Sequence, residues 1–314
     1  MSRGIVIAAV AALAVAVTAA AAVAAPAKPL KGTIVVDGSS TVGPWTTAAA
    51  EAFGRKHKGV RLTVGISGTG GGFSRFCRGE TDLSNASRPI KQTGEVPLCL
   101  ENGVRYVAFT VANDGIALVT NRQNTWARCL TVDEIRRIWE PGSRITSWSQ
   151  VRDGFPNVPL KLYGPGTDSG TFDFFTEKIN GRSGRSRSDY TPSEDDNVLV
   201  QGIMGERGGL GYFGLSYYEE NHGRLNVVQV DSGRGCVTPS VRTVQNGQYR
   251  PLSRPLFIYA KRSSFRRAEV AAFVGFALNN QAAVAKRSAF VPLTPAQAKK
   301  ARNQYTRALR QILG

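Results

Sequence analysis

The stretch Tyr163–Phe172 contains the residue types of an anion-binding loop. Its sequence, YGPGTDSGTF, is rich in glycine and small hydroxyl side chains, and it runs into Phe172–Ile179, an expected helix. The first backbone N–H groups of a helix have no intrahelical partner, and the helix dipole favours negative charge there. Ser169, Gly170 and Thr171 would therefore present amide and hydroxyl donors to an oxyanion.

Two further loops have a similar composition and a similar position in the chain. Asp37–Pro44 lies between the apolar run Thr33–Val36 and the expected helix Trp45–Lys56, and the loop Ser67–Phe73 follows the apolar run Val60–Ile66. A Ser or Thr at one helix start is usually only a cap. Three such loops in one chain favour a shared oxyanion site.

The chain has 314 residues and a formal net charge of +17 at pH 7. Its length allows two domains, and its charge attracts anions. The basic residues are scattered, without a basic helix stripe or an RNA-binding signature, so we expect no nucleic-acid partner. The densest basic cluster, Arg182–Arg187, lies in a Gly/Ser-rich stretch and is expected to be a solvated loop. The final helix, Pro295–Leu313, is interpreted as an ordinary amphipathic surface helix.

Residues 1–24 are expected to be a signal peptide. Arg3 supplies the positive start, Ile5–Val23 the apolar region, and Ala22–Ala24 the A-x-A cleavage site. An uncleaved anchor is the alternative, although a segment made mostly of Ala and Val is a poor one. We therefore expect a periplasmic or otherwise extracytoplasmic protein.

The sequence contains four cysteines and two histidines. An even number of cysteines in an exported chain suggests two disulfides, for which three connectivities are possible. We favour Cys77–Cys99 and Cys129–Cys236. No C-x-x-C pair is present, so neither a metal site nor a cofactor is expected.

Strand and helix candidates alternate along the chain, which predicts an α/β fold. The nearly continuous apolar stretch Tyr106–Val119 is interpreted as one crossing between two domains, and Tyr249–Leu256 as the return. The expected lobes are residues 31–113 plus 248–314 (lobe I) and 114–247 (lobe II). Ligands of open α/β sheets bind beyond the carboxyl ends of the strands, where the three loops lie.

Known catalytic motifs are missing from these loops. Gly166–Gly170 is not G-x-S-x-G, no P-loop is present, and neither histidine lies in a context that suggests a catalytic base. Nothing in the sequence activates a nucleophile. A binding protein is therefore favoured over an enzyme.

Five segments together resemble the phosphate-binding proteins of bacterial high-affinity phosphate ABC transporters, the PstS family. They occur in the family's order along the chain: Asp37–Thr41, Thr81–Pro89, Gly164–Phe172, Ser193–Asn197 and Pro251–Phe257. The resemblance implies a type II periplasmic-binding-protein fold, with two α/β lobes that close over inorganic phosphate. It also implies delivery of phosphate to a membrane ABC permease. We expect a monomer.

The resemblance also implies a set of phosphate-binding residues. They supply amides and hydroxyls from both lobes: Ser40, Thr41, Val42, Thr69, Ser87, Ser169, Gly170 and Thr171. Two positions depart from the family pattern, since Pro165 replaces an arginine and Arg88 replaces an aspartate. We hypothesise that Arg88 supplies the missing positive charge and that Asp168 orients it.

The exchanged aspartate leaves the selectivity open. Monohydrogen phosphate needs an acceptor for its proton, whereas sulfate does not. The candidates for this acceptor are Asp82, Asp114, Asp168 and Asp195, although the first and second are more readily explained as structural residues. The alternatives are a binding protein for another oxyanion, such as sulfate or molybdate, or a secreted phosphate-ester hydrolase.

Overall fold

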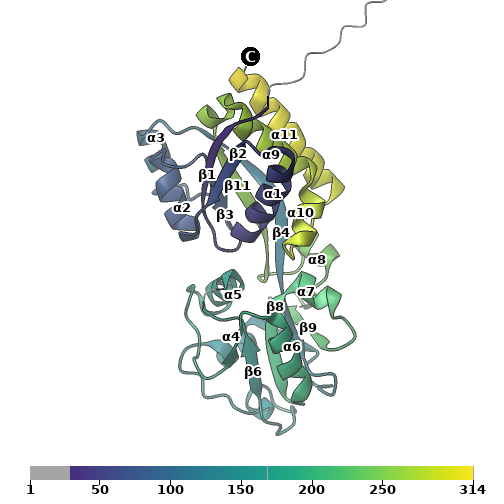
Figure 1. The fold of residues 1–314 in the computed structure, drawn as a ribbon. Helices are drawn as coiled ribbons and strands as arrows, with labels where there is room; N and C mark the ends of the chain where they lie inside the picture. The colour runs from purple at the N-terminus through teal and green to yellow at the C-terminus, as the bar shows by residue number, and fades with distance from the viewer. Residues whose placement is uncertain (1–28, 168, 314) are drawn as a thin grey trace, which may run out of the picture.

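The computed structural model describes residues 29–167 and 169–313, which form two α/β lobes stacked end to end (Figure 1). The expected signal peptide and Asp168 lie outside the described residues. The long strand β4, Tyr106–Thr120, runs through both lobes. We define lobe I as residues 29–113 and 253–313, and lobe II as residues 114–252.

Lobe I is built on a mixed sheet in the order β2-β1-β3-β11-β4. The first three strands are parallel, so their carboxyl ends meet at one edge, while β11 is antiparallel to its neighbours β3 and β4. The strands are β1 (Gly32–Gly38), β2 (Val60–Val64), β3 (Leu83–Ala86) and β11 (Ser253–Lys261). The helices are α1 (Gly43–Lys56), α2 (Gly68–Cys77), α3 (Glu95–Glu101), α9 (Ala268–Asn279), α10 (Gln281–Arg287) and α11 (Pro295–Leu313), with the 3₁₀ turn η2 (Arg262–Arg266).

Two apolar clusters stabilise lobe I. The larger contains Phe53, Phe109 and Phe273, and the smaller contains Phe73 and Phe76. The disulfide Cys77–Cys99 joins α2 to α3 beside the smaller cluster.

Lobe II continues from the second half of β4, which pairs with β8 and β9. Its strands are β5 (Cys129–Thr131), β6 (Lys161–Gly164), β7 (Thr191–Pro192), β8 (Gly209–Gly214), β9 (Asn226–Asp231) and β10 (Cys236–Val237). Its helices are α4 (Val132–Trp139), α5 (Gly170–Asn180), α6 (Asp196–Gly205), α7 (Leu215–Glu220) and α8 (Val241–Gln245), with the 3₁₀ turn η1 (Trp148–Gln150). In the core, the rings of Phe175 and Tyr212 stack at 3.8 Å.

The second disulfide, Cys129–Cys236, lies in lobe II. Both bridges join the cysteines that the sequence analysis favoured. Tyr249 and Leu252 are fully buried in the core of lobe II, and the chain then enters β11 of lobe I. No helix within the described ranges is long and apolar enough to cross a membrane.

The sequence predictions of helices were right for long, periodic segments and wrong at glycines. Helix α11 has the bounds that the sequence predicted, and α4 begins at a capping box between Thr131 and Glu134. The loop expected at Ser67–Phe73 is instead mostly the first turn of α2, which begins at Gly68. A Cβ at Gly72 would lie 2.4 Å from the Cα of Gly38, so glycine allows this helix to pack directly against β1.

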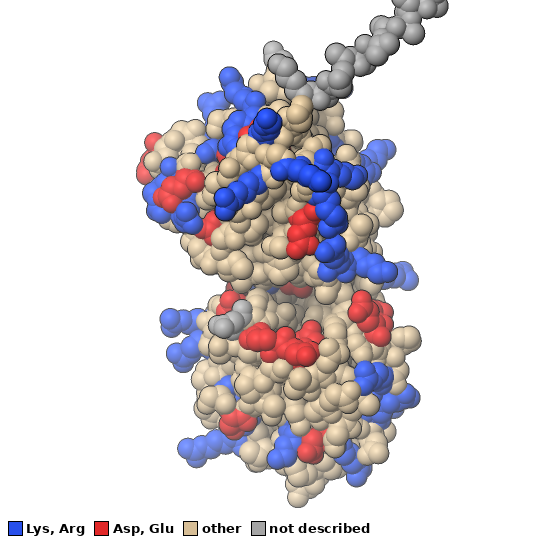
Figure 2. All heavy atoms as spheres, in the orientation of Figure 1, with Lys and Arg blue, Asp and Glu red and all other residues tan. Residues whose placement is uncertain are grey.

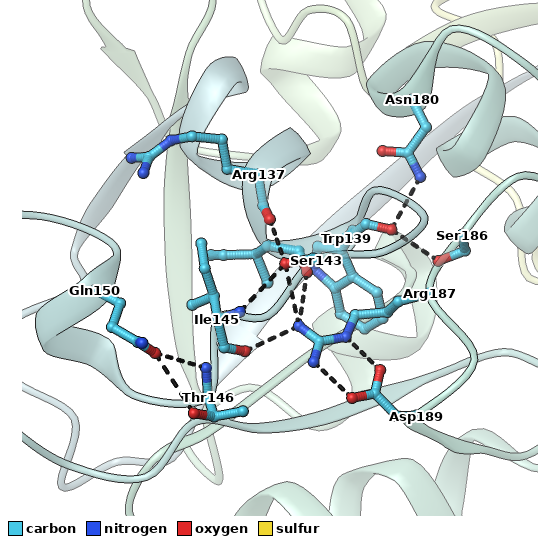
Figure 3. A network of polar contacts seen from close by, with 11 residues as sticks. Arg137, Trp139, Ser143, Ile145, Thr146, Gln150, Asn180, Ser186, Arg187 and Asp189 are labelled. Carbon is cyan, nitrogen blue, oxygen red and sulfur yellow. Dashed lines mark hydrogen bonds and ion pairs between the residues drawn. The ribbon is translucent and has the colours of Figure 1, made fainter.

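Arg187 also differs from the prediction of a solvated loop, because its side chain is only 5% exposed. Its guanidinium donates to the carbonyls of Ile138 and Ile145 at 3.0 and 2.9 Å and pairs with Asp189 (Figure 3). Asn180, at the end of α5, donates to the carbonyl of Trp139 in the same network. The loop after α5 therefore fixes the end of α5 to the end of α4.

Candidate anion-binding site

A cavity of about 680 Å³ opens between the two lobes, and Figure 2 shows a hollow there. Its walls include Ser40 and Thr41 of lobe I, and Ser169, Gly170 and Thr171 of lobe II. The structure thus brings together five of the residues predicted from the sequence. They lie at the starts of two helices, α1 and α5, that approach the cavity from opposite lobes.

The start of α1 leaves donors free for a ligand. Its N-cap residue, Val42, makes no side-chain cap, and Pro44 in the first turn has no N–H. Within the described chain, no acceptor is present for the amides of Ser40, Thr41 and Val42. Val42 itself is fully buried, so only its backbone could serve an anion.

The start of α5 touches the start of α1. Ser169 caps the helix by accepting a hydrogen bond from the amide of Thr171 at 3.2 Å. Thr41 Oγ1 donates to the carbonyl of Gly170 at 3.3 Å. A Cβ at position 170 would lie 2.5 Å from Thr41 Oγ1 and 2.8 Å from the Thr41 amide nitrogen, so glycine is required for this approach of the lobes.

Arg254, which the sequence analysis did not select, is the cation at this junction. Its side chain is 10% exposed, and it donates from Nη2 to Thr41 Oγ1 at 2.8 Å and from Nε to Asp114 at 3.1 Å. The guanidinium carbon also lies 3.7 Å from the centre of the Phe174 ring of α5. One arginine therefore contacts the α1 loop, the crossing strand β4 and lobe II.

Burial lowers the pKa of Arg254, whereas the neighbouring Asp114 carboxylate opposes this effect. Arginine nevertheless stays charged in proteins because its ordinary pKa is so high.

A partial signal for this site was present in the sequence, since Arg254 belongs to the Pro251–Phe257 segment that carries the resemblance. Its partner was not visible, because only the register of β11 against β4 sets Arg254 opposite Asp114.

Arg88 has a different environment from the one we hypothesised. Both of its terminal nitrogens donate to Glu95, at 2.9 and 2.6 Å, and its guanidinium carbon lies 5.7 Å from the centre of the Phe73 ring. Hydrogen bonding to Glu95 raises the pKa of Arg88. Arg88 is thus an ion-pair partner within lobe I and does not line the cavity. The expected partner Asp168 is outside the described residues, so that pairing stays a prediction.

Thr69 and Ser87 contact each other within lobe I. Thr69 Oγ1 accepts from the Ser87 amide at 3.2 Å, and the two hydroxyl oxygens are 3.0 Å apart. Neither residue lines the cavity in this arrangement of the lobes. They nevertheless follow β2 and β3, at the same sheet edge as the loop after β1.

The candidate carboxylates have different partners. Asp82 accepts from the Val35 amide, Ser264 and Arg267, which makes it a structural residue of lobe I. Asp195 caps α6 through the amide of Asn197.

Asp114 is 8% exposed and bonds to Arg254 through Oδ2, while no described group donates to its Oδ1. Asp114 is therefore the described candidate nearest to the site cation.

A cleft between two α/β lobes, lined by two helix N-termini and supported by a buried arginine that contacts one of them, is the arrangement of a substrate-binding protein. Residues 23–281 match a family model described as a PBP (periplasmic-binding-protein) superfamily domain. The chain is 47% identical to "Protein SphX" of Synechococcus elongatus, over 88% of this chain and 82% of that protein. It is 36% identical to "Phosphate-binding protein PstS" of Staphylococcus saprophyticus, over 84% of this chain and 81% of that protein.

Among solved structures, a possible phosphate-binding protein from Planctomyces limnophilus is 44% identical and superposes with a TM-score of 0.85. The alignment covers 89% of this chain and 99% of that one. The chain therefore belongs to the PBP superfamily and, within it, to the family that contains SphX and PstS. This membership confirms the periplasmic-binding-protein fold that the sequence resemblance implied.

Proposed function

We propose that this protein captures inorganic phosphate between its lobes and delivers it to the membrane permease of an ABC phosphate transporter, without a catalytic step. The observation that carries the proposal is the junction at Thr41, a residue of the cavity wall, where two helix N-termini meet and the buried guanidinium of Arg254 donates a hydrogen bond. The relative PstS is named a phosphate-binding protein, and the similar structure from Planctomyces limnophilus is named a possible one, which supports phosphate as the ligand.

The binding set follows from these contacts. The amides of Ser40, Thr41 and Val42 serve the anion from lobe I, and Ser169, Gly170 and Thr171 serve it from lobe II. Arg254 takes the role that the sequence analysis assigned to Arg88, because a guanidinium matches a tetrahedral oxyanion through paired N–H donors. Thr69 and Ser87 are hydroxyl donors at the same sheet edge, and they join the set when an anion is bound.

Asp114 is proposed to accept the proton of monohydrogen phosphate through Oδ1, to which no described residue donates. Sulfate has no proton to donate, and a buried carboxylate would repel it. This arrangement favours phosphate over sulfate.

Calorimetry on protein stripped of anion by unfolding and refolding tests the proposal. Phosphate should bind one to one at pH 7.5, and an excess of sulfate should leave the binding heat unchanged. No heat with phosphate, or equal competition by sulfate, would contradict phosphate-specific binding and favour another oxyanion. The variant Asp114→Asn should lower the preference for phosphate over sulfate, because it removes the acceptor and keeps the shape of the side chain.

Export through the N-terminal segment, a periplasmic or extracytoplasmic location and a monomeric state complete the proposal. Fractionation of cells that express the full chain tests the location. Sequencing the N-terminus of the recovered protein tests cleavage after Ala24.

A further inference from the structure

The net charge of the chain lies almost entirely on lobe I. Lobe I has 22 Lys and Arg against 7 Asp and Glu, a net charge of +15, whereas lobe II has 16 of each. Blue side chains gather on the upper lobe in Figure 2. In the described part of the chain, the cavity is lined by one cation, Arg287, which is paired with Glu51, and Arg254 contacts the wall residue Thr41. Two cations do not explain the excess of positive charge on lobe I.

Helix α11 is the most one-sided element of lobe I, with five basic residues and no acidic one. All five are exposed: Lys299, Lys300, Arg302, Arg307 and Arg310. At about 100° per residue they fall within an arc of about 160°. Three alanines on the opposite side are buried against lobe I: Ala298, Ala301 and Ala308. From the sequence we interpreted this helix as an ordinary amphipathic surface helix and found no basic helix stripe, and the arc of exposed cations corrects that interpretation.

These five side chains are free to meet an external partner. None of them forms an ion pair in the part of the chain that the structure describes. A shallow hollow on α11 is lined by cations and amides and by no carboxylate: Ala296, Lys299, Lys300, Asn303, Gln304 and Arg307. This composition suits phosphodiester groups. No residue of α11 lines the cleft between the lobes, so the face serves a different contact.

We propose that α11 docks on the surface of a membrane that contains anionic phospholipids. Its basic face has no large apolar side chain between Lys299 and Arg310, so the helix rests on the headgroups and does not insert. The described chain begins at the same end of lobe I as the end of α11 (Figure 1). The apolar segment Ile5–Val23, which is expected to direct export, precedes that point in the sequence, so this end of lobe I is the part of the described fold that follows it first.

Vesicle sedimentation tests the proposal with the chain from Ala25 onward, which contains the whole described fold. One set of vesicles is phosphatidylcholine with about one third phosphatidylglycerol, and the other is phosphatidylcholine alone. Each basic residue near an anionic surface raises the partition coefficient roughly fivefold. The variant Lys299→Glu/Arg307→Glu/Arg310→Glu should therefore have an affinity for anionic vesicles that is at least roughly a hundredfold lower.

The matched control is Arg144→Glu/Arg182→Glu/Arg185→Glu, which makes the same change in net charge at exposed sites of lobe II. It should retain most of the binding. Raising the salt from about 0.1 M to about 1 M should abolish binding, because the Debye length falls from about 10 Å to about 3 Å. Calorimetry with phosphate should be the same for both variants and the parent, which separates this proposal from the function of the cleft.

Three results would overturn the proposal: no preference of the parent for anionic vesicles, an equal loss in the lobe II control, or no loss in the α11 variant. Binding of soluble polyphosphate without binding of vesicles would also overturn it, since the partner would then be an anionic polymer. The variant Lys299→Gln/Arg307→Gln/Arg310→Gln is a second test of the role of charge in vesicle binding, because glutamine keeps the helix and removes the charge. It should also lose most of the binding.

Discussion

The two lobes contribute similar backbone chemistry to the cleft and very different charge. Each presents the start of one helix, α1 from lobe I and α5 from lobe II, to the same cavity. Lobe I also supplies Arg254 and carries nearly the whole net charge, whereas lobe II is neutral and supplies the glycine that fits against Thr41. Lobe I would therefore attract and bind the anion. Lobe II would add the hydrogen-bond donors at the start of α5, which approach closely because Gly170 packs against Thr41.

The largest expected effect is the loss of the site cation in lobe I. Arg254→Met removes the positive charge and leaves Asp114 buried without its partner. Breaking a buried ion pair in this way typically lowers the free energy of unfolding by about 3–5 kcal/mol. Phosphate affinity measured by calorimetry should fall roughly a thousandfold.

Arg88→Met is the matched control, because it removes an arginine of lobe I whose guanidinium is paired with Glu95. Its phosphate affinity should change less than about tenfold, as expected for a partly exposed pair. A larger loss in Arg88→Met than in Arg254→Met would mean that Arg88, and not Arg254, is the cation that binds phosphate.

The second effect concerns the fit of lobe II. In Gly170→Ala the added Cβ would meet the Thr41 backbone, which belongs to a fixed loop, so the lobes could not approach as closely as they do in this structure. We expect phosphate affinity to fall roughly a hundredfold, or about 3 kcal/mol, with little change in the melting temperature.

Gly205→Ala serves as the control, because a Cβ there meets no atom within 4 Å. Phosphate affinity should stay unchanged in this variant, and alanine in α6 should slightly stabilise it. If Gly170→Ala bound phosphate as tightly as Gly205→Ala, the close approach at Thr41 would have no part in binding.

A third effect isolates the support of α5 within lobe II. Arg187→Ala leaves the carbonyls of Ile138 and Ile145 without their donor and should lower the free energy of unfolding by about 2–3 kcal/mol. Urea unfolding followed by tryptophan fluorescence measures this loss, since Trp126, Trp139 and Trp148 report on lobe II. The exposed Arg185 is the control, and Arg185→Ala should change the unfolding free energy by less than about 0.5 kcal/mol. Equal losses in the two variants would assign no special role to the buried network.

The sequence predicted those parts of the fold that depend on local pattern. Helix α11 follows from its apolar spacing, and the donor-rich loops after β1 and before α5 follow from their glycine and hydroxyl content. Strand β8, Gly209–Gly214, was missed, because glycine has a low strand propensity. Its glycines have a tertiary cause, since a Cβ at Gly211 would lie 2.5 Å from Ile203 of α6.

The central ion pair of the site could not be predicted from local pattern. Arg254 and Asp114 are 140 positions apart, and only the pairing of β11 with β4 brings them together. Arg88 looked suitable because it lies in a segment that resembles the family, but Glu95, seven residues later, occupies its guanidinium. Such competition between partners depends on three-dimensional geometry and not on the spacing of residue types.

The smallest effect concerns the carboxylates of lobe II, where Asp196 follows Glu194 and Asp195 at the start of α6. Burial, and then the charges of its two neighbours, raises the pKa of Asp196 to about 6. The folded state therefore holds this proton more tightly than the unfolded state, whose carboxyl releases it near pH 4. Stability should fall as the pH rises from about 4 to about 6, by about 3 kcal/mol, and then level off.

Asp196→Asn should remove this decline, so the variant should match the parent near pH 4 and exceed it by about 3 kcal/mol near pH 7. Urea unfolding across this pH range measures the difference. Asp195→Asn is the control, because asparagine caps a helix as well as aspartate does and relieves only one neighbouring charge. A parent whose stability is constant between pH 4 and pH 7 would contradict the burial of a charge at Asp196. In that case the acidic residues that neutralise lobe II would all be solvated and would not lower its stability. The predicted result would instead mean that the ionised carboxylate of Asp196 lowers the free energy of unfolding of lobe II at neutral pH.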